Sequence, residues 1–467
     1  MLDFTHTEQH YPEVKPADLR KENFDEIYAQ FAAQEAANQA ARCSQCGIPF
    51  CQIHCPLQNN IPDWLKLAAE GRLEEAYAMS SATNNFPEIC GRICPQDKLC
   101  EGNCVIEKDF GAVTIGSIER YITEKAFENG WVKAATPARE NGMSIGIIGA
   151  GPAGLAAADM LRRKGYGVHI YDRYDRAGGL MVYGIPNFKL EKTVVKRRHD
   201  LLAESGIVFH LGVEIGKTIT VAELSKKHHA VLIATGVYKA REIDVPEHHL
   251  GGVLPALEYL TASNKKCLGD AIDAAEMDAK DKHVVVIGGG DTAMDCVRTA
   301  VRQGAAKVTC LYRRDKANMP GSAREVKNAE EEGIEFAWLC SPKAFIGKKN
   351  IEQVLVQKMR LASHDKAGRA NVVAIDGETF QLAADMVIKA LGYDADDIPT
   401  MFDTPELKLS PYGTIAVNAQ FETSLPNVFA AGDIVRGASL VVWAIRDGRD
   451  AAEAIHQKLS AQARKVA

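Results

Sequence analysis

Eight of the twelve cysteines lie in the first quarter of the chain, and they carry the strongest chemical signal in the sequence. They form two groups: Cys43, Cys46, Cys51 and Cys55, then Cys90, Cys94, Cys100 and Cys104. Short spacings in loops let several thiolates converge on one inorganic core, and a Cys-Pro step in each group is typical of proteins with two iron–sulfur clusters. Zinc is a weaker alternative, because zinc sites usually pair two Cys-x2-Cys knuckles and only one occurs here. Disulfides are disfavoured because no secretory signal is seen.

An apolar strand over residues 144–148 leads into the glycine-rich loop Gly149-Ala-Gly151-Pro-Ala-Gly154, which opens a helix over residues 152–164. Gly149 permits a tight turn, Gly151 lets the backbone approach a pyrophosphate, and Gly154 lets the helix pack closely on the strand. The helix N-terminus faces the phosphates. Asp172, at the end of the next strand, can accept hydrogen bonds from ribose hydroxyls. Strand, loop, helix and acid together predict a dinucleotide site.

The same unit begins again at residues 283–287, where a strand leads into Gly288-Gly-Gly290-Asp291-Thr292-Ala293. Alanine in place of the third glycine is compatible with the dinucleotide fingerprint. The next strand ends in Arg313 and Arg314, where an acid would bind a ribose hydroxyl. Two guanidinium groups suit a 2′-phosphate, so this loop is predicted to bind NADP(H) rather than NAD(H). The alternative is a solvated basic strand end.

The chain is predicted to fold as three successive regions, which must bring the cysteines and the two nucleotide loops together. Residues 1–140 are expected to be helical, with helices over residues 23–41, 63–78 and 118–130 and the cysteines in loops. From residue 141 strands and helices alternate, and two copies of one βαβ unit predict two parallel-sheet domains. The predicted fold is α/β, with a helical N-terminal iron–sulfur domain (1–140) followed by two nested Rossmann-like domains. The first would span residues 141–248 and 385–467, and the second (249–384) would be inserted into it.

Residues 144–460 resemble two-dinucleotide flavoproteins, the superfamily of glutathione and thioredoxin reductases. The resemblance rests on residues 427–433 (NVFAAGD), 233–236 (IATG) and 388–392 (IKALG), which match a flavin contact and two domain crossovers. It assigns the first loop to FAD and the second to NADPH. The implied FAD contacts are Gly149, Gly151, Ala153, Gly154, Asp172, Gly179, Leu180, Gly236, Gly432, Asp433 and Val441. The implied NADPH contacts are Gly288, Gly290, Asp291, Thr292, Arg313, Arg314 and Gly392.

The whole chain resembles a more specific family. No Cys-x2-Cys pair follows residue 250, so the disulfide relay of thioredoxin reductases is not expected, and electrons must leave the flavin by another route. The two cysteine groups, residues 81–95 (SATNNFPEICGRICP) and the two nucleotide loops together resemble the small (beta) subunits of bacterial NADPH-dependent glutamate synthases. The same module occurs at the N-terminus of dihydropyrimidine dehydrogenase.

This resemblance implies interleaved ligands for two 4Fe–4S clusters. One cluster would take Cys43, Cys46, Cys51 and Cys104. The other would take Cys55, Cys94, Cys100 and, by position, Glu119. Cys90 is the alternative fourth ligand, because iron–sulfur clusters prefer sulfur ligands. The position in the family pattern favours Glu119 instead. A preference for soft ligands does not by itself place Cys90 within reach of the cluster. Without a ligand role, Glu119 would be a carboxylate stabilised near a helix N-terminus.

The resemblance also implies an electron-input subunit with no catalytic side chain of its own. A hydride carries two electrons and a cluster accepts one, so FAD would connect NADPH to the clusters. The implied partner is a large (alpha) subunit that carries FMN and a glutamine amidotransferase and makes glutamate from glutamine and 2-oxoglutarate. Two observations indicate that this chain does not carry out that reaction alone. Leu2 follows Met1, whereas such amidotransferases use a processed N-terminal cysteine as nucleophile. The three predicted domains also leave no residues for an FMN-binding barrel. The alternatives are an NADPH:ferredoxin-type oxidoreductase subunit of a transhydrogenase or pyrimidine reductase, and a zinc-stapled nucleotide-binding protein.

Composition disfavours several other classes of protein. The formal net charge is −6, so no nucleic-acid partner is expected. The most apolar stretch, residues 145–161, is too rich in glycine to span a membrane. The N-terminus has no apolar signal core, which predicts a cytoplasmic protein. The histidines show no ligand spacing, and His228 and His229 are expected in a solvated loop.

Overall fold

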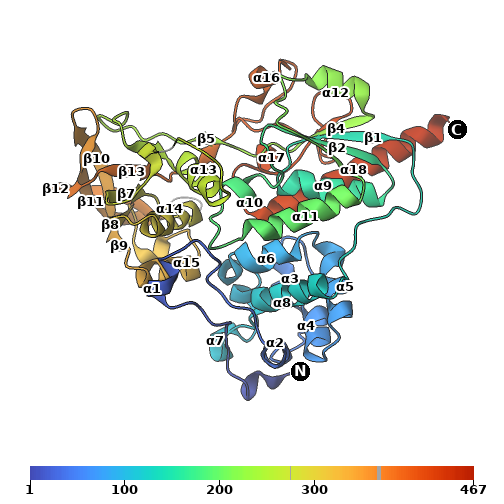
Figure 1. Cartoon of the computed structure of the whole chain (residues 1–467), viewed down its shortest axis with the longest axis horizontal. Coiled ribbons are helices and arrows are strands. Elements are labelled where there is room, and N and C mark those ends of the chain that lie inside the picture. The colour runs from blue at the N-terminus through green and yellow to red at the C-terminus, as the bar shows by residue number, and fades with distance from the viewer. Residues whose placement is uncertain (274, 365–369, 467) are drawn as a thin grey trace.

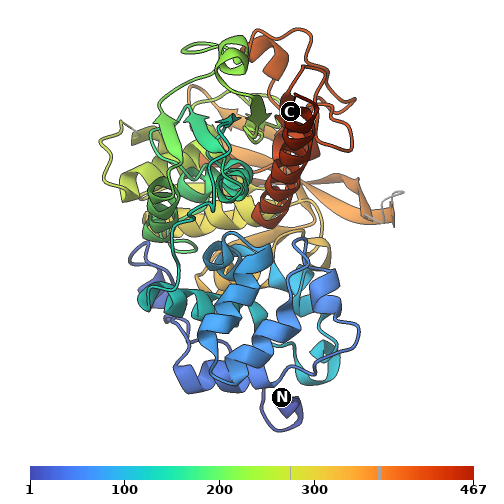
Figure 2. The ribbon, with the colours of Figure 1, turned by 90° about the vertical axis from the view of Figure 1, so that its right-hand side faces the viewer.

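The computed structural model describes residues 1–273, 275–364 and 370–466, which form three units (Figure 1). A helical unit occupies the lower part of the view, and two α/β units lie above it. Figure 2 shows the long C-terminal helix standing over the helical unit. The three units therefore meet around a common junction rather than following one another in a row.

The helical unit contains short helices that pack around the cysteine loops. They are α2 (Ala33–Ala41), α3 (Phe50–Ile53), α4 (Ile61–Ala69), α5 (Leu73–Thr83), α6 (Pro87–Ile93), α7 (Glu107–Phe110) and α8 (Ile115–Glu128), whereas α1 (Ala17–Arg20) lies apart from them, beside the second α/β unit. The predicted helix over residues 23–41 is wrong in its first half, because Glu26 is held by ion pairs to Arg92 and Arg120 in an irregular segment. The predicted helix over residues 63–78 is broken at Gly71, whose φ is +75°.

The first α/β unit is built on a parallel sheet in the order β15-β4-β1-β2-β3. Its strands are β1 (Ser144–Ile148), β2 (Gly167–Asp172), β3 (Val208–Leu211), β4 (Ala230–Ile233) and β15 (Val428–Ala430). Its helices are α9 (Pro152–Arg163), α10 (Leu180–Tyr183), α11 (Lys192–Glu204), α12 (Val221–Lys227), α16 (Ile398–Met401), α17 (Asp433–Arg436) and α18 (Val441–Val466). Ile147 in the central strand pairs with Ile170 on one side and Leu232 on the other. Because β15 comes from the end of the chain, the C-terminal segment completes this sheet.

The second α/β unit repeats the arrangement, with a parallel sheet in the order β6-β13-β7-β8-β9. Its strands are β6 (Val253–Pro255), β7 (His283–Ile287), β8 (Lys307–Tyr312), β9 (Glu335–Trp338) and β13 (Met386–Lys389), and its helices are α13 (Ala256–Cys267), α14 (Asp291–Arg302) and α15 (Ala323–Glu331). The domain boundary predicted at residue 385 is wrong, because β13 pairs with β7 and β6 instead of joining the first sheet. A short apolar strand suits either sheet equally well, so the sequence pattern could not distinguish them.

Two further sheets connect and extend these units. β5 (Lys239–Ala240) pairs antiparallel with β14 (Tyr393–Asp394) where the chain crosses between the two α/β units. An antiparallel sheet of β10 (Cys340–Gly347), β11 (Ile351–His364) and β12 (Ala370–Ala383) was not predicted. It packs on the second sheet through Phe345, Val354 and Val356, which share a buried core with Val285 and Leu311.

The helical unit is fused to the first α/β unit by shared packing. Leu57 and Phe86 belong to the same buried core as Ile145. The buried side chains of Glu88 and Arg198 form an ion pair of 2.7 Å across the same boundary. Such an interface fixes the cysteine loops relative to the first nucleotide loop. In the part of the chain that the structure describes, no helix combines the length and the apolar character needed to cross a bilayer.

One predicted surface feature is also corrected. His228 is only 5% exposed and is not a solvated loop residue. Its ring nitrogens lie 3.0 Å from the Tyr171 hydroxyl and 3.2 Å from the Ser144 hydroxyl. Its ring also lies near those of His169 and His210, so these three histidines form a cluster on the first sheet that is separate from the nucleotide loops.

Candidate functional site

The first nucleotide loop has the geometry that a pyrophosphate requires. Gly149 has a φ of +109°, and a Cβ there would lie 2.4 Å from the Ala234 carbonyl oxygen. A Cβ on Gly154 would lie 2.0 Å from the Gly149 carbonyl oxygen, so both positions need glycine. A Cβ on Gly151, by contrast, would meet no atom within 4 Å. The open space at Gly151 lies at the N-terminus of α9, where backbone N–H groups favour an anion, and it fits the FAD pyrophosphate.

Asp172 lies beside this loop at the end of β2. Its carboxylate accepts hydrogen bonds from the backbone N–H groups of Ala150 (2.6 Å) and Tyr174 (2.8 Å). Burial raises the pKa of Asp172, and these two donors oppose that shift. The side chain lines a cavity of about 60 Å³ together with Arg173, whose guanidinium carbon lies 4.5 Å from the Tyr238 ring centroid. This cavity adjoins the loop on the side where a dinucleotide's ribose lies in such folds, and the Asp172 carboxylate faces it.

The remaining predicted flavin contacts converge on the same loop. The Gly178 N–H donates to the Ala150 carbonyl (2.8 Å), and a Cβ on Gly179 would lie 2.9 Å from the Gly151 Cα. This contact brings Leu180, the first residue of α10, alongside the loop. These close approaches explain why the segment at residues 178–180 begins with two glycines.

The C-terminal contacts approach the first turn of α9 from the other side. A Cβ on Gly432, after β15, would lie 2.8 Å from the Ala153 Cβ. Asp433 follows, and its carboxylate accepts a hydrogen bond from the Ser439 hydroxyl (2.7 Å). Burial raises the pKa of Asp433. Gly236 follows β4 with a φ of +75°, so the predicted residues after β1, β4 and β15 all lie at one edge of the first sheet.

The second nucleotide loop repeats this geometry. A Cβ on Gly288 would lie 2.3 Å from the Ala390 carbonyl oxygen, whereas a Cβ on Gly290 would meet nothing within 4 Å. Asp291 and Thr292 begin α14, and the Asp291 carboxylate accepts a hydrogen bond from the Ser322 N–H (2.9 Å). The open space before α14 fits the pyrophosphate of a second dinucleotide.

The two arginines predicted to bind a 2′-phosphate differ in how far their side chains are already engaged by the protein. Arg313 is exposed, whereas the Arg314 Nε donates to the Ala370 carbonyl (2.7 Å). Both follow β8 at the same edge of the sheet as Gly288, as a 2′-phosphate site requires. Gly392 lies at the crossover instead, where its carbonyl accepts from the Arg241 N–H (3.0 Å).

A pocket of about 200 Å³ lies where the three units meet, and it is called the junction pocket here. The first α/β unit contributes Leu180 and Val441, the second contributes Asp291 and Thr292, and the helical unit contributes Cys94. The structure thus brings together predicted contacts of all three kinds of cofactor. A nicotinamide and an isoalloxazine ring entering from the two nucleotide loops would meet beside a cysteine.

The first ligand set lies together in the helical unit. Burial raises the pKa of Cys43, and the nearby thiolates of Cys104 and Cys46 add to that shift, so these thiols lie close together. Burial and, to a smaller extent, the neighbouring thiolates of Cys104 and Cys43 together raise the pKa of Cys51 to about 12. The Gln45 side-chain amide donates to the Cys43 sulfur (3.3 Å). Cys104, from the second sequence group, therefore lies with three cysteines of the first group.

The second set lines one buried space, called the cysteine cavity here: Cys55, Cys90, Cys94, Cys100 and Glu119. Cys90 and Glu119 are thus both within reach of the other three thiols. The Asn84 side chain lies between them, because its amide donates to the Glu119 carboxylate (3.1 Å) and its carbonyl lies 3.7 Å from the Cys90 sulfur. Burial raises the pKa of Glu119 to about 8 and that of Cys55 to about 11.

The chemistry of this cavity fits an iron–sulfur cluster. Four thiols and a carboxyl would all be anionic as ligands, yet no lysine, arginine or histidine lines the cavity among the residues described. Buried negative charge of this density needs a cationic centre, which a cluster supplies. Over the described ranges, no three His, Cys, Asp or Glu side chains converge as tightly as a single metal ion requires.

Sequence reasoning missed the charged residues at the edge of the junction pocket. Lys189 forms an ion pair with Asp295 (2.7 Å) and lies 3.8 Å from the Glu325 carboxylate. Although burial opposes ionisation, Lys189 and Arg298 hold the pKa of Glu325 at about 2. These residues come from two units far apart in sequence, so no local pattern could have paired them.

Two family models match the chain in succession. Residues 20–131 match the model described as dihydropyrimidine dehydrogenase domain II, 4Fe-4S cluster. Residues 143–448 match the model of pyridine nucleotide-disulphide oxidoreductases. The first match covers both cysteine groups, and the second covers both nucleotide loops.

Individual relatives match over nearly their full length. The chain is 61% identical to the glutamate synthase (NADPH) small chain of Azospirillum brasilense, over 99% of this chain and 97% of that protein. It is 45% identical to the protein of the same name from Escherichia coli K12, over 95% of this chain and 96% of that protein. Among solved structures, Mycobacterium tuberculosis FprA in complex with NADPH matches 69% of this chain and 86% of its own length, with a TM-score of 0.58 and 20% sequence identity. This match shows that the two proteins share a fold.

Proposed function

The chain belongs to the family of small chains of NADPH-dependent glutamate synthases, and from this premise we propose that it is the electron-input subunit of such an enzyme. It oxidises NADPH and supplies electrons to a large (alpha) subunit. That subunit would carry FMN and the glutamine amidotransferase and would make glutamate from glutamine and 2-oxoglutarate. Twelve unpaired cysteines suit a reducing cytoplasm, where the clusters can form.

The two nucleotide loops hold the two dinucleotides. When bound, FAD converts the two electrons of a hydride into the single electrons that clusters accept. Gly151 and the α9 N-terminus would hold its pyrophosphate, and Asp172 would bind a ribose hydroxyl. Gly290 and the α14 N-terminus would do the same for NADPH, with Arg313 as the main contact of its 2′-phosphate.

We assign two 4Fe–4S clusters to the two cysteine sets. The first takes Cys43, Cys46, Cys51 and Cys104, and the second takes Cys55, Cys94, Cys100 and Glu119. The second set carries less sulfur, but the Glu119 carboxylate is already oriented by amide and hydroxyl donors from Asn84 (3.1 Å) and Ser80 (3.4 Å). Such outer hydrogen bonds are what fix a carboxylate ligand. Cys90 stays the alternative.

The junction pocket is the observation that carries this proposal. It places Leu180 and Val441 from the flavin side within one cavity with Asp291 and Thr292 from the NADPH side and Cys94 from the helical unit. A chain that only bound nucleotides would have no need for a thiol at this point. The single cavity therefore supports electron transfer from NADPH towards the clusters.

The cysteines also indicate where electrons leave. Cys94 packs against the core of the first α/β unit and Cys55 packs against both that core and the core of the helical unit, whereas Cys43, Cys51 and Cys104 pack in the core of the helical unit alone. The loop between Cys46 and Cys55 exposes three large apolar side chains: Ile48 (64%), Phe50 (46%) and Ile53 (55%). Exposed apolar side chains beside a redox centre suit a protein partner, and we propose that the large subunit covers this loop.

Anaerobic reconstitution tests the function. Purified chain should contain flavin, iron and sulfide, and NADPH should bleach the flavin band in stopped-flow mixing. The chain alone should make no glutamate, whereas the chain mixed with a large subunit should do so from glutamine and 2-oxoglutarate. Absence of flavin bleaching would reject the proposal. Rapid ferredoxin reduction without binding to a large subunit would instead favour an NADPH:ferredoxin-type oxidoreductase.

A further inference from the structure

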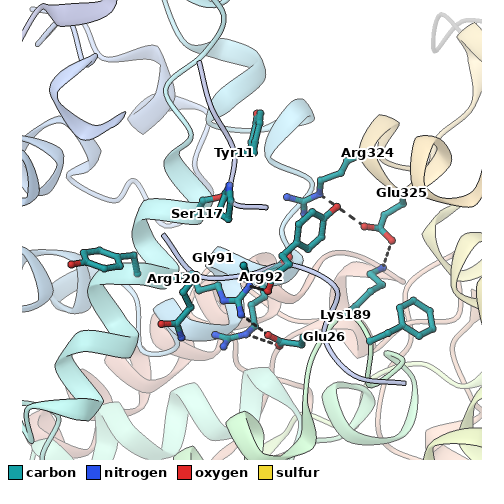
Figure 3. Close-up of a pocket in the computed structure, with 15 residues that line it drawn as sticks. Tyr11, Glu26, Gly91, Arg92, Ser117, Arg120, Lys189, Arg324 and Glu325 are labelled. Atoms are coloured by element: carbon teal, nitrogen blue, oxygen red, sulfur yellow. Dashed lines mark hydrogen bonds and ion pairs between the residues drawn. The ribbon is translucent and has the colours of Figure 1, made fainter. Parts of the chain in front are cut away.

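An irregular segment, residues 20–28, touches all three units and is called the strap here. It begins at the end of α1, which lies beside α15 in Figure 1. It then crosses in front of the junction towards the helical unit and the first α/β unit. Figure 3 shows Glu26 from the strap facing Arg92 and Arg120, with Lys189, Arg324 and Glu325 nearby. Arg92 lies between two cysteines of the second group, but Glu26, Arg120 and Lys189 belong to no nucleotide or cysteine motif.

One end of the strap is anchored in the second α/β unit. Arg20 is 4% exposed, and its guanidinium donates to the Asn328 side-chain carbonyl (3.0 Å). It also forms an ion pair with Glu331 and lies 3.8 Å from the Glu332 carboxylate. The Asn328 amide in turn donates to the Tyr28 hydroxyl (2.7 Å). Both ends of the strap therefore hold the C-terminal half of α15.

The middle of the strap is anchored in the other two units. The Glu26 carboxylate receives hydrogen bonds from Arg92 and Arg120 of the helical unit, each at 2.7 Å. It also accepts from the backbone N–H of Glu191, just before α11 (3.2 Å). The Asn187 amide donates to the Phe24 carbonyl (2.9 Å). The strap is thus bonded on both sides of Lys189, which lines the junction pocket.

A buried ion network continues from the strap to the pocket. Arg298, which is fully buried, joins Glu332 (2.8 Å) to Glu325 (2.6 Å). Glu325 lies 3.8 Å from Lys189, and Lys189 pairs with Asp295 (2.7 Å). Asp295 lies one turn after the start of α14. Buried charges keep a fixed geometry only while their partners stay in place, so the strap and the pocket share one rigid arrangement.

We propose that Arg20 and Glu26 are positioning residues for hydride transfer, which align the NADPH loop with the flavin loop across the junction pocket. The inference rests on the proposed function. Arg20 fixes α15 and the ion network, whereas Glu26 fixes the stretch that carries Lys189. A displacement of about 1 Å between donor and acceptor can lower a rate by about 100-fold, so alignment at this distance matters.

The test uses the holoprotein with flavin and clusters, mixed anaerobically with NADPH. Arg20→Met should lower the limiting rate of flavin bleaching by about 10- to 100-fold while the apparent Kd of NADPH changes little. The long-wavelength charge-transfer absorbance that reports stacked nicotinamide and flavin rings should weaken in parallel. Hydrogen exchange of the α15 amides should become faster. Tyr28→Phe, which removes one hydroxyl, should shift all three readouts in the same direction but less.

Lys21→Met is the matched control. Lys21 is the next residue, and its ammonium pairs only at the surface with Asp18 (2.9 Å), so its loss should change none of these readouts. If Arg20→Met holds its cofactors and bleaches at the wild-type rate, the inference is overturned. If Arg20→Met fails to hold them, an unchanged rate and absorbance in Tyr28→Phe would overturn it. Wild-type protein that does not bleach would instead reject the proposed function itself.

Discussion

Cys94 and Val442 line both the junction pocket and the cysteine cavity, and so form the wall that these two cavities share. Cys94 follows α6 of the helical unit, and Val442 lies in the first turn of α18. The second cysteine set thus reaches the flavin side directly through one of its own members, Cys94, with Val442 beside it. Cys94 and the other residues of the cysteine cavity would therefore hold a one-electron acceptor nearer the flavin side than Cys43, Cys51 and Cys104 would.

Replacing Cys94 should separate flavin reduction from cluster reduction. Cys94→Ala removes a proposed ligand, so iron should fall by about one cluster, roughly four atoms per chain. NADPH should still bleach the flavin, but reduced-cluster EPR signals should not appear. Cys267→Ala is the control, because Cys267 is exposed and belongs to neither set. Full iron content in Cys94→Ala would contradict the assignment.

The fourth ligand of the second set can be decided in the same way. Glu119 and Cys90 line one cavity, but only Glu119 is oriented by several donors, from Asn84 (3.1 Å) and from Asn59 and Ser80 (each 3.4 Å). Glu119→Ala should therefore lose one cluster, whereas Cys90→Ala should keep both.

A matched substitution lies on the same helix. Glu128→Ala, at the exposed end of α8, should leave iron and sulfide per chain unchanged. The opposite pattern, with iron lost from Cys90→Ala and kept in Glu119→Ala, would show that sulfur is the fourth ligand.

The nucleotide loops could be predicted from the sequence because the contacts that determine their conformation lie close together along the chain. Gly149 and Gly154 must be glycine for reasons contained within one strand, one turn and one helix. The pairing of Cys104 with Cys43, by contrast, depends on how two distant loops meet. Spacing alone left that pairing open, and only the family resemblance implied it.

Predictions failed where contacts between segments distant in sequence overrode local propensity. Residues 23–32 have helix-forming composition, but Glu26 pairs with Arg92 of α6 and Arg120 of α8, and these ion pairs hold the segment in an irregular conformation. The boundary at residue 385 failed because β13 could add to either parallel sheet. His228 looked solvated beside Lys227 and His229, yet the β1 backbone at Gly146 packs directly on its ring.

Two glycines of the FAD loop should respond differently to alanine. A Cβ at Gly154 would lie 2.0 Å from a backbone oxygen, so Gly154→Ala should lower the melting temperature as well as flavin content. A Cβ at Gly151 meets no protein atom within 4 Å but occupies the space for the pyrophosphate. Gly151→Ala should therefore lose flavin while the flavin-free proteins unfold alike. If Gly151→Ala retained as much flavin as the wild type, the assignment of this loop to the FAD site would be wrong.

Arg313 should carry most of the preference for NADPH over NADH. A charge-assisted hydrogen bond contributes about 1.5–3 kcal/mol, so Arg313→Ala should raise the Kd of NADP⁺ by about 10- to 100-fold. The Kd of NAD⁺ should stay the same, because NAD⁺ has no 2′-phosphate. Arg314→Ala should have a smaller effect, since its Nε is already bonded to the Ala370 carbonyl. Calorimetric titration of both nucleotides measures this, and an equal loss for both would contradict the assignment.

The histidine cluster on the first sheet should make stability depend on pH. Burial, with smaller contributions from the positive charges of His169 and Lys227, lowers the pKa of His228 from 6.5 to about 4. The folded protein therefore keeps His228 neutral at pH values where the unfolded chain binds a proton. Stability is fully present above about pH 6.5 and is lost as the pH falls towards 4.

Replacing His228 should remove part of this dependence. After allowance for partial solvent screening, its contribution is about 1–2 kcal/mol between those pH values. His228→Gln keeps a side chain that can bond to Tyr171 and Ser144 but cannot be protonated, so its melting temperature should fall less steeply from pH 6.5 to 4. His248→Gln, at an exposed position, should follow the wild-type curve. Flavin fluorescence during heating reports the unfolding of this unit, and parallel curves for His228→Gln and wild type would show that the buried ring does not titrate in this range.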